Sequence, residues 1–206
     1  SPFFEDRLDK FISPTIRFRD GRKSVTRVLV DLARQHKILS DQAEIAVEKA
    51  YSAQIEFNSK LHAAGREALQ RLMESGYPGI VLVGRPYNIY DKGINLDVPS
   101  KLRDYYGINV IPIDFMPVDD VDIEDVNDNM YWDYGRKILA AARFVGRFPN
   151  LHIIYITNFK CGPDSYIKHY ISSTSGKPFL TLQFDGHSND AGIMTRCEAY
   201  LDSKGM

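Results

Sequence analysis

Three short stretches carry the residues most suited to chemistry, and the central one contains a cysteine. The stretches are GRPYNIYDKG (84–93), NFKCGPDS (158–165) and DGHSNDAG (185–192). Cys161 directly precedes Gly162, Pro163 and Asp164, which are typical of the start of a helix. A thiol there faces the positive end of the helix dipole, which favours the thiolate. A thiolate ligates iron or attacks electrophiles; the alternative role is that of a small buried apolar residue.

Cys197 has a simpler interpretation. It shares a predicted helical face with Met194, Tyr200 and Leu201, so packing explains it. It lies 36 positions after Cys161 (197 minus 161), and the sequence contains no CxxC pair. This chain alone therefore cannot provide the four cysteines of a cluster.

Four other residues are candidates for lining a site around Cys161. Arg85 follows a predicted strand and could hold an anion or form a surface salt bridge. Tyr87 and Asn88 could line the same pocket or simply form the turn. His187, close to an aspartate, would complete a Cys–His–Asp catalytic set, although polar residues in such a place usually begin a helix.

Composition and charge indicate an ordinary globular protein and argue against several kinds of partner. The chain has 206 residues, of which 44% are hydrophobic and 26% are charged, as in ordinary globular proteins. Its formal net charge of −1 argues against binding to nucleic acid or to an anionic membrane. No apolar run approaches the ~20 residues needed to span a bilayer. Two cysteines are too few for a disulfide framework, so we expect a cytoplasmic protein.

The segment 119–128 is rich in acidic residues but lacks the features of a calcium site. Neither the ligand spacing nor the turn glycine of an EF-hand is present. We therefore interpret the segment as a solvated loop.

From Tyr77 onward, strand and helix patterns alternate, which predicts a parallel sheet with right-handed crossovers. The predicted strands are GIVLVG (79–84), NVIPID (109–114), LHIIYITNF (151–159) and PFLTLQFD (178–185). Pro112 removes a backbone donor and suggests an edge position for the second strand. We therefore expect a doubly wound, flavodoxin-like α/β domain over 77–206, with strand order 2-1-3-4. The three chemical stretches would meet at the carboxyl edge, where such sheets bind ligands.

Residues 1–76 are expected to form a helical extension or a linker to a missing upstream domain. Ser40 can cap a helix that continues to Ser75 and would be about 50 Å long. Such a helix either breaks near Gly65 or reaches toward something absent from the chain. Because the sequence begins without Met, we expect it to be a piece of a longer protein.

The C-terminal part of the 2-hydroxyacyl-CoA dehydratase family is similar to this sequence at GRPYN (84–88), NFKCGPDS and the ending DGHSNDAGIMTRCEAYLDS. The resemblance is closer to large fused proteins described as CoA-substrate-specific enzyme activases, and is stronger over 77–206 than over 1–76. In that family, cysteines from two α/β domains hold an iron–sulfur cluster, either a 4Fe–4S cubane or a linked double cubane. An ATP-hydrolysing activator delivers a low-potential electron to the cluster.

This resemblance implies that Cys161 is one cluster ligand and that the others belong to a preceding domain. The implied partners are other domains of the same polypeptide, including the ATPase activator, and a CoA thioester. The resemblance gives Arg85, Tyr87, Asn88 and His187 a pocket-lining role at most. The fragment alone is expected to be inactive. The rival hypotheses are a non-catalytic flavodoxin-like scaffold and a cysteine-nucleophile enzyme.

Overall fold

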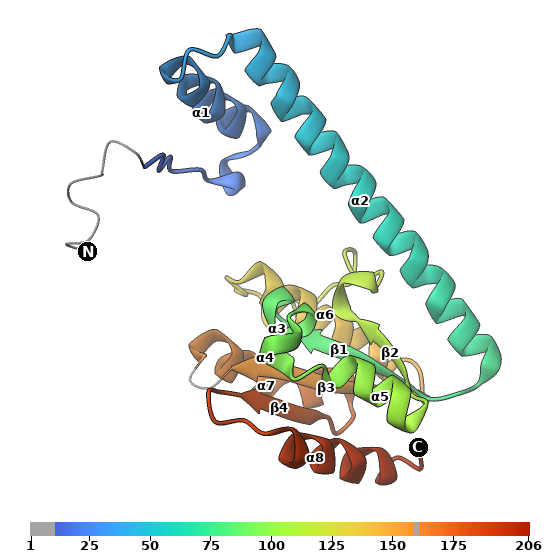
Figure 1. The fold of residues 1–206 in the computed structure, drawn as a ribbon. Coiled ribbons are helices and arrows are strands. Elements are labelled where there is room, and N and C mark those ends of the chain that lie inside the picture. The colour runs from blue at the N-terminus through green and yellow to red at the C-terminus, as the bar shows by residue number, and fades with distance from the viewer. Residues whose placement is uncertain (1–10, 159–160) are drawn as a thin grey trace. The chain divides into compact units, whose positions relative to one another are not determined.

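A computed structural model describes residues 11–158 and 161–206 (Figure 1). Its helices are η2 (Phe18–Asp20), α1 (Arg22–Gln35), α2 (Ser40–Ser75), α3 (Pro86–Tyr90), α4 (Lys92–Asn95), α5 (Val98–Tyr106), η3 (Ile113–Phe115), α6 (Asp133–Gly146), α7 (Gly162–Ser175) and α8 (Asp190–Asp202). Its strands are β1 (Gly79–Gly84), β2 (Asn109–Pro112), β3 (Leu151–Asn158) and β4 (Leu180–Phe184). Within the described residues, every helix is too short or too polar to cross a bilayer.

The four strands form one parallel sheet in the order β2-β1-β3-β4, which confirms the predicted topology. Pro112 pairs with Leu82 at the end of β2, and β2 has β1 as its only neighbour in the sheet. The edge position therefore tolerates the missing N–H of the proline. The two central strands β1 and β3 pair from Gly79↔Leu151 to Gly84↔Ile156. Since all strands are parallel, the segments that follow them leave from one edge.

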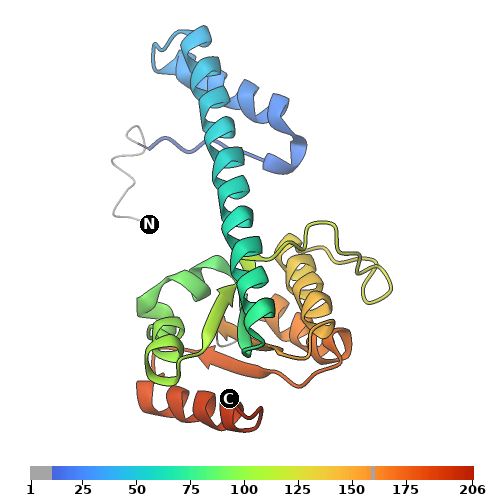
Figure 2. The same ribbon diagram turned by 90° about the vertical axis from the view of Figure 1, so that its right-hand side faces the viewer.

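Helices cover both faces of the sheet, as right-handed crossovers require. The packed pair α6 and α7 lies on one face, and α5 lies on the other (Figure 2). An ion pair of 2.5 Å between Lys101 of α5 and Asp190 joins α5 to the start of α8. The strands are therefore enclosed between two helical layers.

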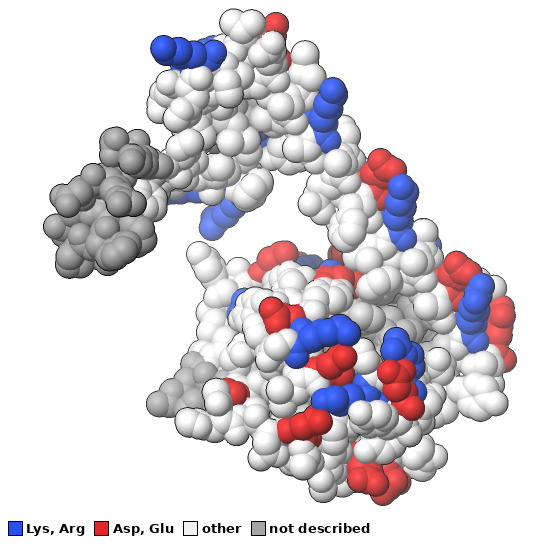
Figure 3. All heavy atoms as spheres, viewed as in Figure 1, with Lys and Arg blue, Asp and Glu red and all other residues white. Residues whose placement is uncertain are grey.

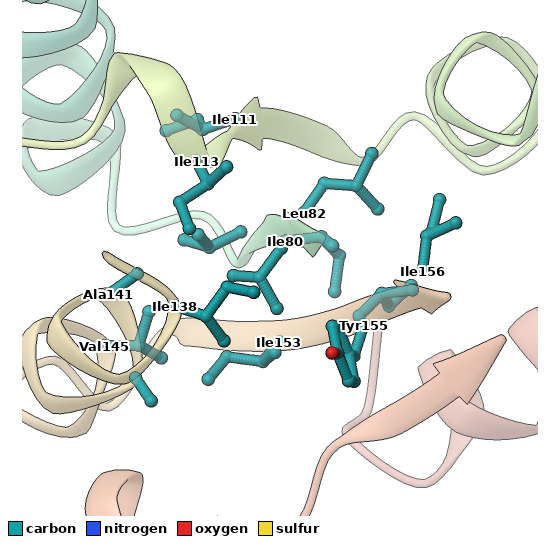
Figure 4. Close-up of a cluster of buried hydrophobic side chains, with 14 of the residues drawn as sticks. Ile80, Leu82, Ile111, Ile113, Ile138, Ala141, Val145, Ile153, Tyr155 and Ile156 are labelled. Carbon is teal, nitrogen blue, oxygen red and sulfur yellow. The ribbon is translucent and has the colours of Figure 1, made fainter. Parts of the chain in front are cut away.

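The core of this α/β arrangement is built from β-branched and aliphatic side chains of the central strands. Ile80 and Leu82 of β1, Ile153 of β3 and Ile138 of α6 belong to one cluster of buried hydrophobic side chains (Figure 4). All six residues of β1 are buried. A strand buried on both faces needs apolar residues at every position, which explains why GIVLVG shows no alternation of polar and apolar residues.

The chain divides into two compact units, Ser1–Ser59 and Lys60–Met206, which we call the helical unit and the α/β unit. In the helical unit, α1 and the first part of α2 bury a small set of residues: Val25, Val30, Ala43 and Val47. Residues 60–75 contain the final turns of α2, and Leu69 and Leu72 there are buried in the core of the α/β unit.

The helix α2 runs unbroken from Ser40 to Ser75, so the alternative of a break near Gly65 is wrong. Gly65 is buried where α2 meets the backbone of Phe115, and a Cβ atom there would lie 1.8 Å from the Phe115 carbonyl oxygen. The glycine thus permits close packing instead of ending the helix. Ser40 lies inside the first turn, where its Oγ accepts a hydrogen bond of 2.7 Å from Arg34 Nε.

Several predicted element boundaries need correction. The strand expected over 178–185 spans Leu180–Phe184, and Phe159, the expected end of the third strand, lies outside the described residues. The strand expected over 109–114 ends at Pro112, because Ile113, Asp114 and Phe115 form the short 3₁₀ helix η3. The last helix is capped by Asn189, whose side chain accepts from the Gly192 N–H at 2.8 Å. Ser188, the residue before this cap, forms hydrogen bonds with Asp185.

Charged side chains of both signs are mixed over the molecular surface that faces the viewer in Figure 3, along α2 and over the α/β unit. This view agrees with the near-neutral formal charge of −1. Neither sign dominates that face, so it offers no broad basic field for nucleic acid.

Candidate functional site

The site is built where the central strands β1 and β3 end side by side. Gly84, the last residue of β1, has a φ of 155°, and a Cβ atom there would lie 2.4 Å from the carbonyl oxygen of Ile156. Any side chain would push the two strands apart at this point. The close approach places Arg85, the next residue, over the end of β3.

A buried ion pair connects the segments that follow these strands. Arg85 Nε donates to Asp164 Oδ1 at 3.1 Å, and Thr157 Oγ1 donates to the other carboxylate oxygen of Asp164 at 2.7 Å. Asp164 is 1% exposed, so both of its oxygens are satisfied within the protein. Burial opposes the charge of Arg85, but the attraction and hydrogen bond of Asp164 outweigh it and raise the pKa of Arg85. Arg85 is therefore a structural ion-pair partner in this chain.

Cys161 stands beside this ion pair as the N-cap residue of α7. It is partly exposed and has an extended backbone (φ −71°, ψ 109°). Its carbonyl accepts the first bond of the helix from Ser165 N–H at 2.9 Å, while its side chain makes no cap hydrogen bond. Arg85 and Tyr87 both lie within electrostatic range of Cys161. The thiol therefore lies at a helix N-terminus with an arginine nearby, as the sequence predicted.

The neighbouring segment 84–93 is more ordered than the loop that the sequence suggested. Pro86 begins the short helix α3, and Asp91 caps α4 by accepting from Gly93 N–H and Ile94 N–H. Tyr87 is half exposed, and burial of its hydroxyl raises its pKa, an effect that the charge of Arg85 partly offsets. Tyr87 is thus a half-exposed side chain close to the cysteine.

Two buried amide groups in this region lack hydrogen-bond partners within the described residues. Asn88 is fully buried, and neither Oδ1 nor Nδ2 has a partner. Oδ1 of Asn158, at the end of β3, is also buried and unpaired. Most buried polar atoms in proteins are satisfied, so these are exceptions. Whether Asn88 lines a pocket stays a prediction.

His187 is exposed in the segment after β4. Asp185 Oδ1 accepts from the backbone N–H of His187 at 2.8 Å and from Ser188 Oγ at 3.2 Å, and no bond to the imidazole is formed among the described residues. The alternative of a Cys–His–Asp set, in which an aspartate orients the histidine ring, is therefore not assembled among the described residues.

A second buried carboxylate at the carboxyl edge was missed by the sequence. Asp114 accepts hydrogen bonds from Lys137 Nζ at 2.6 Å, Tyr134 OH at 2.7 Å and Tyr90 OH at 3.0 Å. Burial alone would raise the pKa of Asp114, but the bonds from Lys137 and the two tyrosines outweigh it and lower that pKa. Burial, followed by the charge of Asp114, raises the pKa of Tyr90. This network ties α3 to α6.

Cys197 is fully buried on α8, in agreement with its predicted packing role. Burial raises its pKa to about 11, so it is a neutral thiol at ordinary pH. In the acidic segment, Asp125 forms an ion pair of 2.6 Å with Arg143. Within the described residues, no group of three or more His, Cys, Asp or Glu side chains is placed to hold a metal ion.

Comparison with known proteins gives one match. Residues 3–116 match the family described as CoA enzyme activase uncharacterised domain (DUF2229). The matched range covers the helical unit and the α/β unit as far as η3, whereas Cys161 lies outside it. No curated protein and no solved structure matches the chain.

Proposed function

The chain belongs to the CoA enzyme activase uncharacterised domain family, and from this premise we propose that its α/β unit supplies Cys161 as one ligand of an iron–sulfur cluster. The whole protein would be an ATP-activated, dehydratase-like or low-potential electron-transfer component. The observation that carries the proposal is the place of Cys161: a partly exposed thiol at the start of α7, beside the point where the strand order reverses.

The residues of this chain fit one cluster ligand and no more. A cubane cluster is held by four cysteine thiolates. Cys161 is partly exposed. Cys197 is buried on the inner face of α8, and the raised pKa of Cys197 opposes the thiolate form that iron requires. We therefore propose that the remaining ligands come from another domain of the same polypeptide.

The surroundings of Cys161 suit a sulfur that acts as an anionic ligand. The N-terminus of α7 and the guanidinium of Arg85 both place positive potential near it. The Asp164 carboxylate fixes the position of Arg85 by a 3.1 Å bond, and its negative charge offsets part of the potential of the guanidinium. When bound, an iron–sulfur cluster would supply one-electron chemistry. Tyr87, Asn88 and His187 are proposed to line the same pocket.

The proposal includes two kinds of partner. One is an ATP-hydrolysing activator domain, and the other is a CoA thioester that receives the electron. Both follow from the family resemblance, and the family name supports only the coarser link to CoA enzyme activases.

The test compares two cysteine variants of the full-length protein purified without oxygen. We expect Cys161→Ala to lower bound iron and sulfide and to abolish ATP-driven reduction, while circular dichroism stays unchanged. Cys197→Ala is the matched control: it removes a buried thiol, costs roughly 1–2 kcal/mol of stability and leaves iron content unchanged. Full iron and undiminished reduction in Cys161→Ala would favour the scaffold alternative.

A further inference from the structure

Four aromatic side chains form a contiguous row where α6 and α7 begin. We call Tyr131, Trp132, Tyr166 and Tyr170 the aromatic row. Ring centroids are 6.1 Å apart for Tyr131–Trp132, 6.1 Å for Trp132–Tyr166 and 5.2 Å for Tyr166–Tyr170. The first two contacts are edge-to-face, a favourable aromatic geometry.

A glycine and two hydrogen bonds fix this row. A Cβ atom on Gly135 would lie 2.9 Å from Ile167 Cδ1, so the glycine lets the start of α6 approach α7 closely. That approach brings Trp132 against Tyr166. The Tyr166 hydroxyl accepts from Asn127 Nδ2 at 2.8 Å and from Tyr170 OH at 3.1 Å. The row is therefore held in a defined arrangement.

Two of the four side chains of the row are exposed, and the other two, Trp132 and Tyr170, are partly buried. Tyr131 is 79% exposed and Tyr166 is 43% exposed. Contiguous exposed aromatic surface marks interaction sites, and tyrosine and tryptophan are enriched among the residues that dominate protein–protein binding energy.

The segment that leads into the row has a strong negative charge. Between positions 119 and 133 the sequence has no Lys or Arg and seven acidic residues: Asp119, Asp120, Asp122, Glu124, Asp125, Asp128 and Asp133. Two of these are paired, Asp119 with His62 and Asp125 with Arg143. The other five are exposed. Figure 2 shows this connection between β2 and α6 as a long loop that reaches out beside α6.

We propose that the aromatic row and the acidic segment 119–133 together form a docking surface for a protein partner that presents arginine or lysine around an apolar centre. The exposed carboxylates have no Lys or Arg within their own segment. The segment is therefore negatively charged and would complement a positively charged partner surface. Arginine also stacks on tyrosine and tryptophan faces, so the same cation can use both parts of the surface. Tyr166 lies five residues after Cys161 (166 minus 161), so a docked partner would border the cysteine. The proposal does not depend on the iron–sulfur hypothesis.

The only tryptophan of the chain, Trp132, lies in the row and reports on it directly. The test titrates the protein with a short helical peptide that carries arginines beside a leucine stripe, and with the same peptide carrying glutamates in place of the arginines. We expect saturable change of Trp132 emission with the basic peptide alone, weakened by added salt. Equal response to both peptides, or no response to either, would overturn the proposal.

Variants then distinguish binding at this surface from a general effect of the net charge of the protein. Asp122→Asn/Asp128→Asn/Asp133→Asn should weaken binding about tenfold, and Tyr131→Ala by a similar factor. The control Glu74→Gln/Glu198→Gln/Asp202→Asn removes the same charge from exposed positions elsewhere and should leave binding unchanged. Equal weakening in the control would contradict the proposal. Sedimentation of the protein alone adds a further check: self-association lost in the first variant would make a second copy the occupant and overturn the stated partner.

Discussion

The helical unit and the α/β unit differ in how well each can bury its apolar residues. In the α/β unit, a sheet between two helical layers encloses rows such as Ile80–Val83, which are fully buried. In the helical unit, α1 and α2 bury Val25 and Val47, but Phe18 is 72% exposed and Ile55 is 63% exposed. Three layers can surround a core, whereas a pair of helices cannot. The stability of the chain should therefore reside mainly in the α/β unit.

The largest expected effect tests the close contact of Gly65 in the α/β unit. Gly65→Val would place a side chain where even a Cβ lies 1.8 Å from the Phe115 carbonyl oxygen, so we expect a loss of roughly 3 kcal/mol or more. Urea unfolding followed by Trp132 fluorescence measures it. Gly186→Ala, which faces open space, is the control and should change stability by less than about 0.5 kcal/mol. Similar losses in both variants would contradict the packing role.

The second-largest expected loss of stability comes from replacing a buried carboxylate, and replacing an exposed carboxylate is the comparison. Asp114→Asn leaves the Lys137 ammonium without its charged partner, so we expect a loss of roughly 2–3 kcal/mol at pH 7. Asp31→Asn removes an exposed i,i+3 partner of Arg34 in the helical unit and should cost less than about 0.5 kcal/mol.

The Asp114 prediction also has a pH dependence with a defined sign. The folded-state pKa of Asp114 is below its unfolded value of about 3.9, so its stabilisation is present above that value. It is lost as the pH falls through the folded-state pKa. The gap between wild type and Asp114→Asn should stay constant from pH 7 to pH 5 and shrink below about pH 4. A constant gap down to pH 2 would refute the assignment.

A matched pair of valines gives the smallest of these effects and the most direct comparison. Val81 in β1 is 0% exposed and Val47 in α2 is 7% exposed. We expect Val81→Ala to lower the free energy of unfolding by roughly 2 kcal/mol and Val47→Ala by less than about 1 kcal/mol, since less packing surrounds Val47. The reverse order would mean that the helical unit is the better packed.

The sequence was sufficient for the sheet because its signals are local. Buried strands appear as short apolar runs, and Pro112 identifies the edge strand by the donor it lacks. The secondary structure of segment 84–93 was harder to predict from the sequence, because helices of four or five residues such as α3 and α4 are too short to show a periodic pattern. Gly65 was ambiguous for another reason: a glycine in a helix reads as a break unless the surface packed against it is known.

The site was predictable only in part because its contacts are distant in sequence. Cys161 could be placed at the carboxyl edge from the strand that precedes it and the Gly-Pro-Asp that follows it. The pairing of Arg85 with Asp164 joins residues 79 positions apart, and the Asp114 network joins residues 20 to 24 positions apart. No local pattern indicates which arginine and which aspartate meet. Such pairs follow from the fold, after the strands have brought their ends together.

Cys197 lies on the buried face of α8, so chemical labelling of its thiol reports transient detachment of that helix. In the closed chain, we expect a small neutral maleimide to label the partly exposed Cys161, whereas Cys197 is fully buried and its raised pKa of about 11 makes it slow to react. A second adduct can form only in molecules whose C-terminal helix has lifted from β4. The ratio of singly to doubly labelled chains in a mass spectrum, followed over time, thus counts how often that helix detaches.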